Sequence, residues 1–64
     1  MFEKVMGKKV RISYFRYTGT SKEERFIFGT IVSEDADFVQ IRGNTDNRLF
    51  GINKKNIIEW REPR

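Results

Sequence analysis

The chain has 64 residues, enough for one small domain, and its 13 Lys and Arg outnumber its nine Asp and Glu to give a formal net charge of +4. It contains no Cys and no His, which excludes disulfides and argues against a zinc site or a Cys-His or Ser-His catalytic pair. The positive charge favours polyanionic partners, and self-association is one way for so small a domain to gain stability, although many domains of this size fold alone.

The first third of the chain predicts a helical segment followed by a strand. Apolar residues at helical spacing before Gly7 predict one or two helical turns over residues 2–6. Apolar, aromatic and polar side chains then alternate, which predicts a strand over residues 8–17. The polar segment 18–24 contains a glycine that can take a positive φ, so it is predicted to be a hairpin loop.

Four more strands are predicted, over residues 25–33, 37–42, 48–52 and 57–60, with turns rich in Asp, Asn and Gly between them. Gly29 interrupts the first of these strands, and a glycine there allows the sharp bend that a small barrel needs. The sequence therefore predicts an all-β protein. We expect a five-stranded, strongly bent, SH3-like barrel with a short N-terminal helical turn, formed by residues 1–64 as a single domain.

The alternation also predicts which side chains fill the barrel. The expected inner positions are Val10, Ile12, Ile27, Ile31, Val39, Ile41, Ile52 and Ile58, with Phe2 and Met6 covering one open end. Six Phe residues exceed what so small a core holds, so we expect some aromatic surface to be exposed or shared with a partner. Exposed rings on a basic barrel stack bases or pack subunit interfaces, and the interface role is the favoured one.

Several anchor residues of this pattern resemble those of a known family. They are the segment Gly7-Lys-Lys-Val10-Arg-Ile12 after the helical turn, Gly29 with Ile27 and Ile31 on either side, Asp35 six residues later, and the ending Asn56-Ile57-Ile58-Glu-Trp60. This order is similar to that of the Sm-like proteins, a group that includes bacterial Hfq. The resemblance extends over most of the chain.

The resemblance implies a five-stranded barrel that assembles into rings through its fourth and fifth strands and binds single-stranded RNA. Applied to this sequence, it implies a homo-oligomer that forms through edge strands 48–52 and 57–60. The family's RNA-binding motifs are altered, however. Val39 stands where a base-reading asparagine is expected, and Ile52-Asn53-Lys54 replaces the family's Ile-Arg-Gly. The resemblance therefore supports the family's fold for this sequence more strongly than it supports the family's RNA-binding pocket.

Nucleic-acid binding is the leading functional hypothesis. The predicted phosphate-binding residues are Lys8, Lys9, Arg11, Lys54 and Lys55, and Phe38 is predicted to stack on a base. We expect no enzymatic activity, cofactor or metal. Three acidic residues at positions 34, 35 and 37 could hold a divalent cation, but a solvated acidic turn is the favoured interpretation.

Two other functions remain open. The first is a protein-interaction module, an SH3-like barrel that docks a peptide or an assembly through Tyr14, Phe15, Tyr17 and Trp60. The second is a small barrel that coats duplex DNA, as archaeal chromatin proteins do, although Asp35, Asp37 and Asp46 argue mildly against it. No apolar stretch is long enough to span a membrane, and we expect a cytoplasmic protein.

Overall fold

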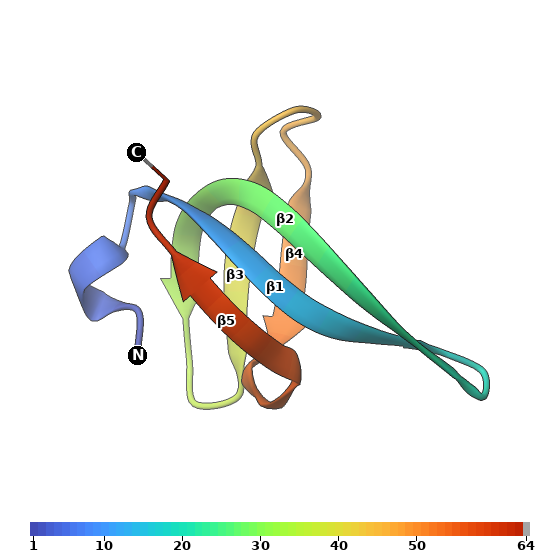
Figure 1. Cartoon of the computed structure of the whole chain (residues 1–64). Coiled ribbons are helices and arrows are strands. Elements are labelled where there is room, and N and C mark those ends of the chain that lie inside the picture. Colours follow the sequence, from blue (N-terminus) through green and yellow to red (C-terminus); the bar gives the residue numbers. More distant parts are fainter. Residues whose placement is uncertain (64) are drawn as a thin grey trace.

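The computed structural model describes residues 1–63 and contains five antiparallel strands in one sheet (Figure 1). The strands are β1 (Lys9–Thr18), β2 (Ser21–Glu34), β3 (Phe38–Gly43), β4 (Leu49–Asn53) and β5 (Ile57–Arg61). Two 3-10 turns complete the described chain, η1 (Glu3–Val5) before β1 and η2 (Lys54–Asn56) before β5. The prediction of an all-β domain with a short N-terminal helical turn is confirmed.

The strand order in the sheet is β4-β3-β2-β1-β5. Successive strands from β1 to β4 form antiparallel hairpins, and β5 returns to pair with β1, with Arg11 opposite Arg61. The two edges of the sheet are therefore β4 and β5. In residues 1–63 no helix has the length and apolar character needed to cross a membrane.

The β1–β2 hairpin is longer than predicted, and the expected loop over residues 18–24 is wrong. Thr18 pairs with Ser21, so only Gly19 and Thr20 form the turn, and Gly19 has a φ of 58°. The polar residues after this turn continue as strand because both faces of the hairpin meet water there and no apolar side is required. Figure 1 shows the hairpin projecting from the barrel as an arm, which we define as residues 15–25.

The bend predicted at Gly29 is present. β2 pairs with β1 up to Thr30 and with β3 from Gly29 onward, so the strand turns from one half of the barrel to the other at this residue. Gly29 lies opposite Gly43. A Cβ atom at Gly29 would lie closer than 3.0 Å to both the carbonyl oxygen of Arg42 and Cγ2 of Ile41. Only a residue without a side chain allows the two strands to approach this closely.

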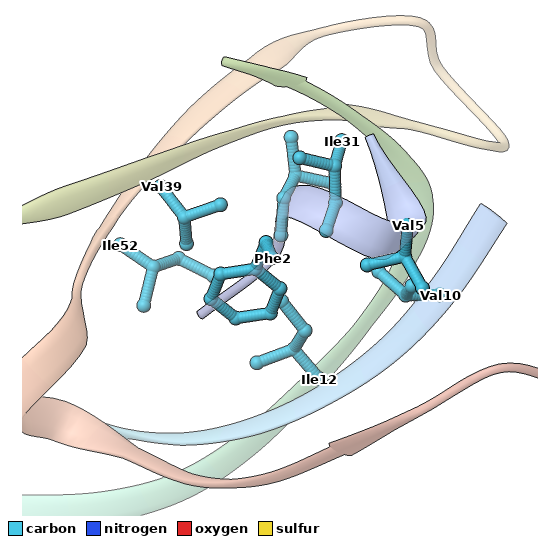
Figure 2. Packing of buried hydrophobic residues seen from close by; sticks show 8 residues of the cluster. Phe2, Val5, Val10, Ile12, Ile31, Val39 and Ile52 are labelled. Atoms are coloured by element: carbon cyan, nitrogen blue, oxygen red, sulfur yellow. The ribbon is translucent and has the colours of Figure 1, made fainter. Parts of the chain in front are cut away.

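The core consists of eight buried apolar residues, Phe2, Val5, Val10, Ile12, Ile31, Val39, Ile41 and Ile52 (Figure 2). Six of the predicted inner positions are in this set, and the predicted role of Phe2 as a cover is also confirmed. The Phe2 ring lies in the middle of the cluster, and its centroid is 5.0 Å from that of Trp60. Ile27 is half-buried and packs against the cluster.

Two predicted core positions are wrong. Met6 is 42% exposed and Val5 is buried, because η1 is a 3-10 turn with three residues per turn, which places Phe2 and Val5 on one face. Ile58 is also 42% exposed. Glu59 pairs with Ser13 and Ile57 with Tyr14, so a bulge at Ile58 breaks the alternation and leaves this side chain outside.

Candidate nucleic-acid interface

One side of the β1–β2 hairpin carries four aromatic side chains. Phe15 and Tyr17 of β1 and Phe26 and Phe28 of β2 share this side, because residues directly opposite in an antiparallel pair project in the same direction. Tyr17, Phe26 and Phe28 are 59%, 60% and 44% exposed, and Phe15 is half-buried. We call these four residues the aromatic strip.

Cationic side chains lie directly over the rings of the strip. The Arg11 guanidinium carbon is 4.7 Å from the Phe26 centroid and 5.9 Å from the Phe28 centroid, and the two rings meet edge to face at 6.4 Å. Lys22 Nζ lies 4.0 Å from the Phe15 centroid. Within residues 1–63 the Arg11 side chain makes no ion pair and no hydrogen bond, so its donors are available for an anionic ligand.

An open hollow of about 810 Å³ lies beside these rings. Arg11, Phe26 and Phe28 form one side, and Arg61, Glu62 and Pro63 at the end of β5 form the other. Two arginines on adjacent strands thus border one aromatic surface, with a single carboxylate among the lining residues. The hollow combines ring faces for stacking with guanidinium groups for phosphate contacts.

Three of the predicted phosphate-binding residues lie at the start of β1. Arg11 is part of the site just described. Lys9 is exposed and projects to the same side of β1 as Arg11, since the two are separated by one residue. Lys8 is also exposed and precedes the strand, where its carbonyl oxygen accepts a hydrogen bond from Ile31 N at 3.2 Å.

The other three predicted residues lie elsewhere: Phe38 follows the turn between β2 and β3, and Lys54 and Lys55 lie on η2, which is hydrogen-bonded to that turn. Phe38 is 45% exposed at the start of β3. Its backbone N–H and that of Asp37 donate to Asp35 Oδ1 at 2.8 Å, and these two hydrogen bonds lower the pKa of Asp35. Lys55 is exposed on η2, whose first residue, Lys54, donates its N–H to the Asp37 carbonyl at 2.8 Å. The structure therefore divides the predicted site between two surfaces.

Lys54 has an internal role. Its Nζ pairs with Glu34 Oε2 and also donates to the Asp35 carbonyl, and its side chain is only 17% exposed. Glu34 is 10% exposed, and its Oε1 accepts from Phe2 N at 2.9 Å. Glu34 at the end of β2 is thus joined to η2 by the ion pair and to the N-terminal segment by the hydrogen bond from Phe2. The charge of Lys54 is therefore engaged within the protein.

The carboxylate of Glu34 should make folding sensitive to acid. The ion pair with Lys54 and the Phe2 N–H lower its pKa below the ordinary value of 4.5, against an opposing effect of burial. Its contribution to stability is complete above the ordinary pKa and is lost as the pH falls through the lowered, folded-state pKa. We expect the Glu34→Gln variant to be destabilised by about 1–3 kcal/mol at neutral pH and to lose less stability than wild type on acidification.

Urea unfolding at several pH values measures this effect. Glu59→Gln is the matched control, because Glu59 is exposed and makes no ion pair or side-chain hydrogen bond within the described residues. Equal acid sensitivity of wild type and Glu34→Gln would show that other carboxylates dominate the loss of stability in acid.

Within residues 1–63, no three acidic side chains are grouped as a metal site would require.

The sequence interpretation did not single out Phe26, Phe28 or Arg61. The alternation over residues 25–33 already placed Ile27 inside, and therefore the two flanking phenylalanines outside. Of the aromatic residues assigned to a docking surface, Phe15 and Tyr17 do face outward. Trp60 instead is half-buried against Phe2.

Comparison with known proteins gives no match to a protein-family model, to a curated protein or to a solved structure.

Proposed function

We propose that this protein binds single-stranded nucleic acid, in particular RNA, through the aromatic strip and the cations around it. The observation that carries the proposal is the Arg11 guanidinium over the exposed rings of Phe26 and Phe28. Every base has a face that stacks on an aromatic ring, so a row of exposed rings binds single strands with little sequence preference.

The dimensions and charges of the strip suit such a ligand. From Tyr17 to Arg11, which lies opposite Phe28, the strip extends over seven residues of β1, and the six steps between them correspond to roughly 20 Å of strand. Lys9, Lys22 and Arg61 place positive charge along or beside it. Glu24, Glu59 and Glu62 lie near the same rings and reduce the local excess of positive charge. We therefore expect affinity that depends on stacking as well as on salt.

Phe26→Ala should weaken binding of a fluorescent oligouridine by about 1–3 kcal/mol, roughly 5- to 150-fold in Kd, because it removes a stacking surface. Fluorescence anisotropy at low and moderate salt measures the loss. Phe38→Ala is the control, since it deletes another exposed ring, 45% exposed against 60% for Phe26, on the other surface. Wild-type affinity should also fall steeply as salt is raised.

The same titrations separate this proposal from its competitors. If only Phe38→Ala weakens binding, the site lies at the β2–β3 turn. Tighter binding to duplex DNA than to single strands would favour a duplex-coating protein. If RNA does not bind at micromolar protein, and a specific protein complex forms that is insensitive to salt, the barrel is an interaction module.

We further propose that the protein self-associates through its edge strands, as the resemblance to Sm-like rings implies. Two observations support this proposal. Both edges, β4 and β5, offer unpaired backbone groups, and each carries an exposed apolar residue, Leu49 at 51% and Ile58 at 42%. Pairing β4 of one copy with β5 of the next would satisfy the backbone groups and bury these side chains.

Ile58→Glu should shift the protein toward monomer, because it places a charge at the proposed contact. Light scattering at two protein concentrations gives the mass in solution. Val32→Glu is the control, since Val32 is 43% exposed but belongs to the inner strand β2. A wild-type protein that is monomeric at both concentrations would contradict the proposed self-association. The proposed nucleic-acid binding does not depend on this result.

A further inference from the structure

A second cavity, of about 330 Å³, opens on the other side of the β1–β2 hairpin. Tyr14 and Ile27 from the hairpin and Phe50 from β4 give it apolar walls. Arg25, Asn44 and Asp46 add polar groups. Apolar walls with a few polar groups are typical of a small-ligand site, and the volume is near the lower end for such sites.

This cavity adjoins the aromatic strip. Tyr14 and Arg25 lie opposite each other in the hairpin and alternate with Phe15 and Phe26, so they project to the opposite side. Phe26 and Phe28 nevertheless border both the cavity and the hollow beside Arg11. A strand that stacks on the strip can therefore turn one base around these residues into the cavity.

The loop that borders the cavity is held by hydrogen bonds to β2 and within itself. Asn44 N donates to the Phe28 carbonyl at 3.0 Å, and Gly43 N donates to the Arg48 carbonyl at 2.7 Å. Arg48 N donates to Asp46 Oδ1 at 3.2 Å. Within the described chain Asp46 Oδ2 and the Asn44 side chain have no hydrogen-bond partner, so they are available to a ligand.

We propose that this cavity binds a single guanine base of the bound strand; the inference rests on the proposed nucleic-acid function. Guanine presents N–H donors on one edge and the O6 and N7 acceptors on another. The free Asp46 oxygen can accept from the donor edge, and Arg25 can donate to O6 and N7. Arg25 is available for this role because the one ion pair it makes within residues 1–63, with Glu23 at 3.4 Å, is half exposed and weak.

The other bases satisfy fewer of these groups. Adenine and cytosine can donate an amino group to Asp46, but neither offers Arg25 the O6 and N7 pair. Tyr14 and Phe50 provide ring surface for any base and do not discriminate. The selectivity thus depends on the carboxylate and the guanidinium together.

The first test compares two RNAs of about twelve nucleotides, an oligouridine and the same strand with one central guanosine, a length within the range that small barrels bind. Wild type should bind the guanosine strand about tenfold more tightly. Asp46→Asn should abolish this preference and keep the affinity for oligouridine, since its amide oxygen still accepts from Arg48 N. Asp37→Asn removes the same charge from another turn and should keep the preference. Equal binding of both strands by wild type would overturn the inference.

The second test separates the cavity from the strip. Guanosine 5′-monophosphate, added to ¹⁵N-labelled protein, should shift the amide signals of residues 43–46 and 50, and uridine 5′-monophosphate should not. Shifts at these residues in a protein that binds neither RNA would contradict the proposed RNA binding and support a guanine site in the cavity. Binding of oligouridine without any shift specific to the guanosine nucleotide would support RNA binding and contradict the guanine site. Absence of both signals would overturn both.

Discussion

Replacing Phe2 with alanine should unfold much of the protein at room temperature. The side chain is 0% exposed and lies at the centre of the core (Figure 2). Its ring also packs against that of Trp60, with the centroids 5.0 Å apart. Removing a buried phenylalanine costs about 3–5 kcal/mol. A core of this size supplies little more than about 3–5 kcal/mol in total. One side chain near the start of the chain therefore determines whether the barrel persists.

Urea unfolding followed by Trp60 fluorescence and by circular dichroism measures this loss. Met6→Ala is the control, because Met6 belongs to the same segment but is 42% exposed. It should change stability by no more than about 0.5 kcal/mol. A Phe2→Ala variant that unfolds at the wild-type urea concentration would show that the N-terminal segment is dispensable and that the five strands hold themselves together.

Most of the core could be predicted from the alternation of apolar and polar residues in the sequence. Alternation in β1 and β3 places residues such as Val10, Ile12 and Val39 on one face, and a strand has no other way to bury them. The pattern failed at Met6 and Ile58, where a 3-10 turn and a bulge change the period locally. Neither feature has a signature in the residue pattern, because both depend on what the neighbouring strands allow.

The arm shows a second limit of sequence patterns. Residues 18–24 are polar, and polarity predicted a loop, yet residues 21–24 pair with β1 and only Gly19 and Thr20 form a turn. Cross-strand contacts such as Lys22 over Phe15 and Thr18 Oγ1 to Glu23 at 3.3 Å support the pairing. These contacts require a register, which a single segment read on its own does not provide.

The candidate site was predictable only in part, for a related reason. Positive charge at the start of the chain identified Arg11, and the excess of phenylalanines predicted exposed rings. Which rings lie beside Arg11 depends on the pairing of Arg11 with Phe28 and of Ser13 with Phe26. Lys54 shows the opposite error. Its charge suggested a phosphate contact, but the fold places Glu34 beside it and uses that charge internally.

Gly29→Ala should destabilise the barrel by about 3 kcal/mol or more, at or beyond the upper end of the cost of overpacking a core. The added methyl group would meet the Arg42 carbonyl oxygen at less than 3.0 Å, and a backbone atom cannot move aside as a flexible side chain can. The direction of the change in stability distinguishes steric crowding from strand propensity. Alanine is otherwise preferred to glycine inside a strand by roughly 0.5–1 kcal/mol, so propensity alone predicts a more stable protein.

Gly51→Ala separates these two effects. Gly51 also lies inside a strand, β4, but no atom beyond its chain neighbours lies within 4 Å of a Cβ placed there. This variant should be as stable as wild type or more stable by about 0.5–1 kcal/mol. Thermal unfolding of both variants gives the comparison. If Gly29→Ala matches Gly51→Ala, β2 can bend without the close approach to β3, and the glycine would not be what allows the bend. If Gly29→Ala alone loses stability, the bend between the two halves of the sheet depends on the absence of one methyl group.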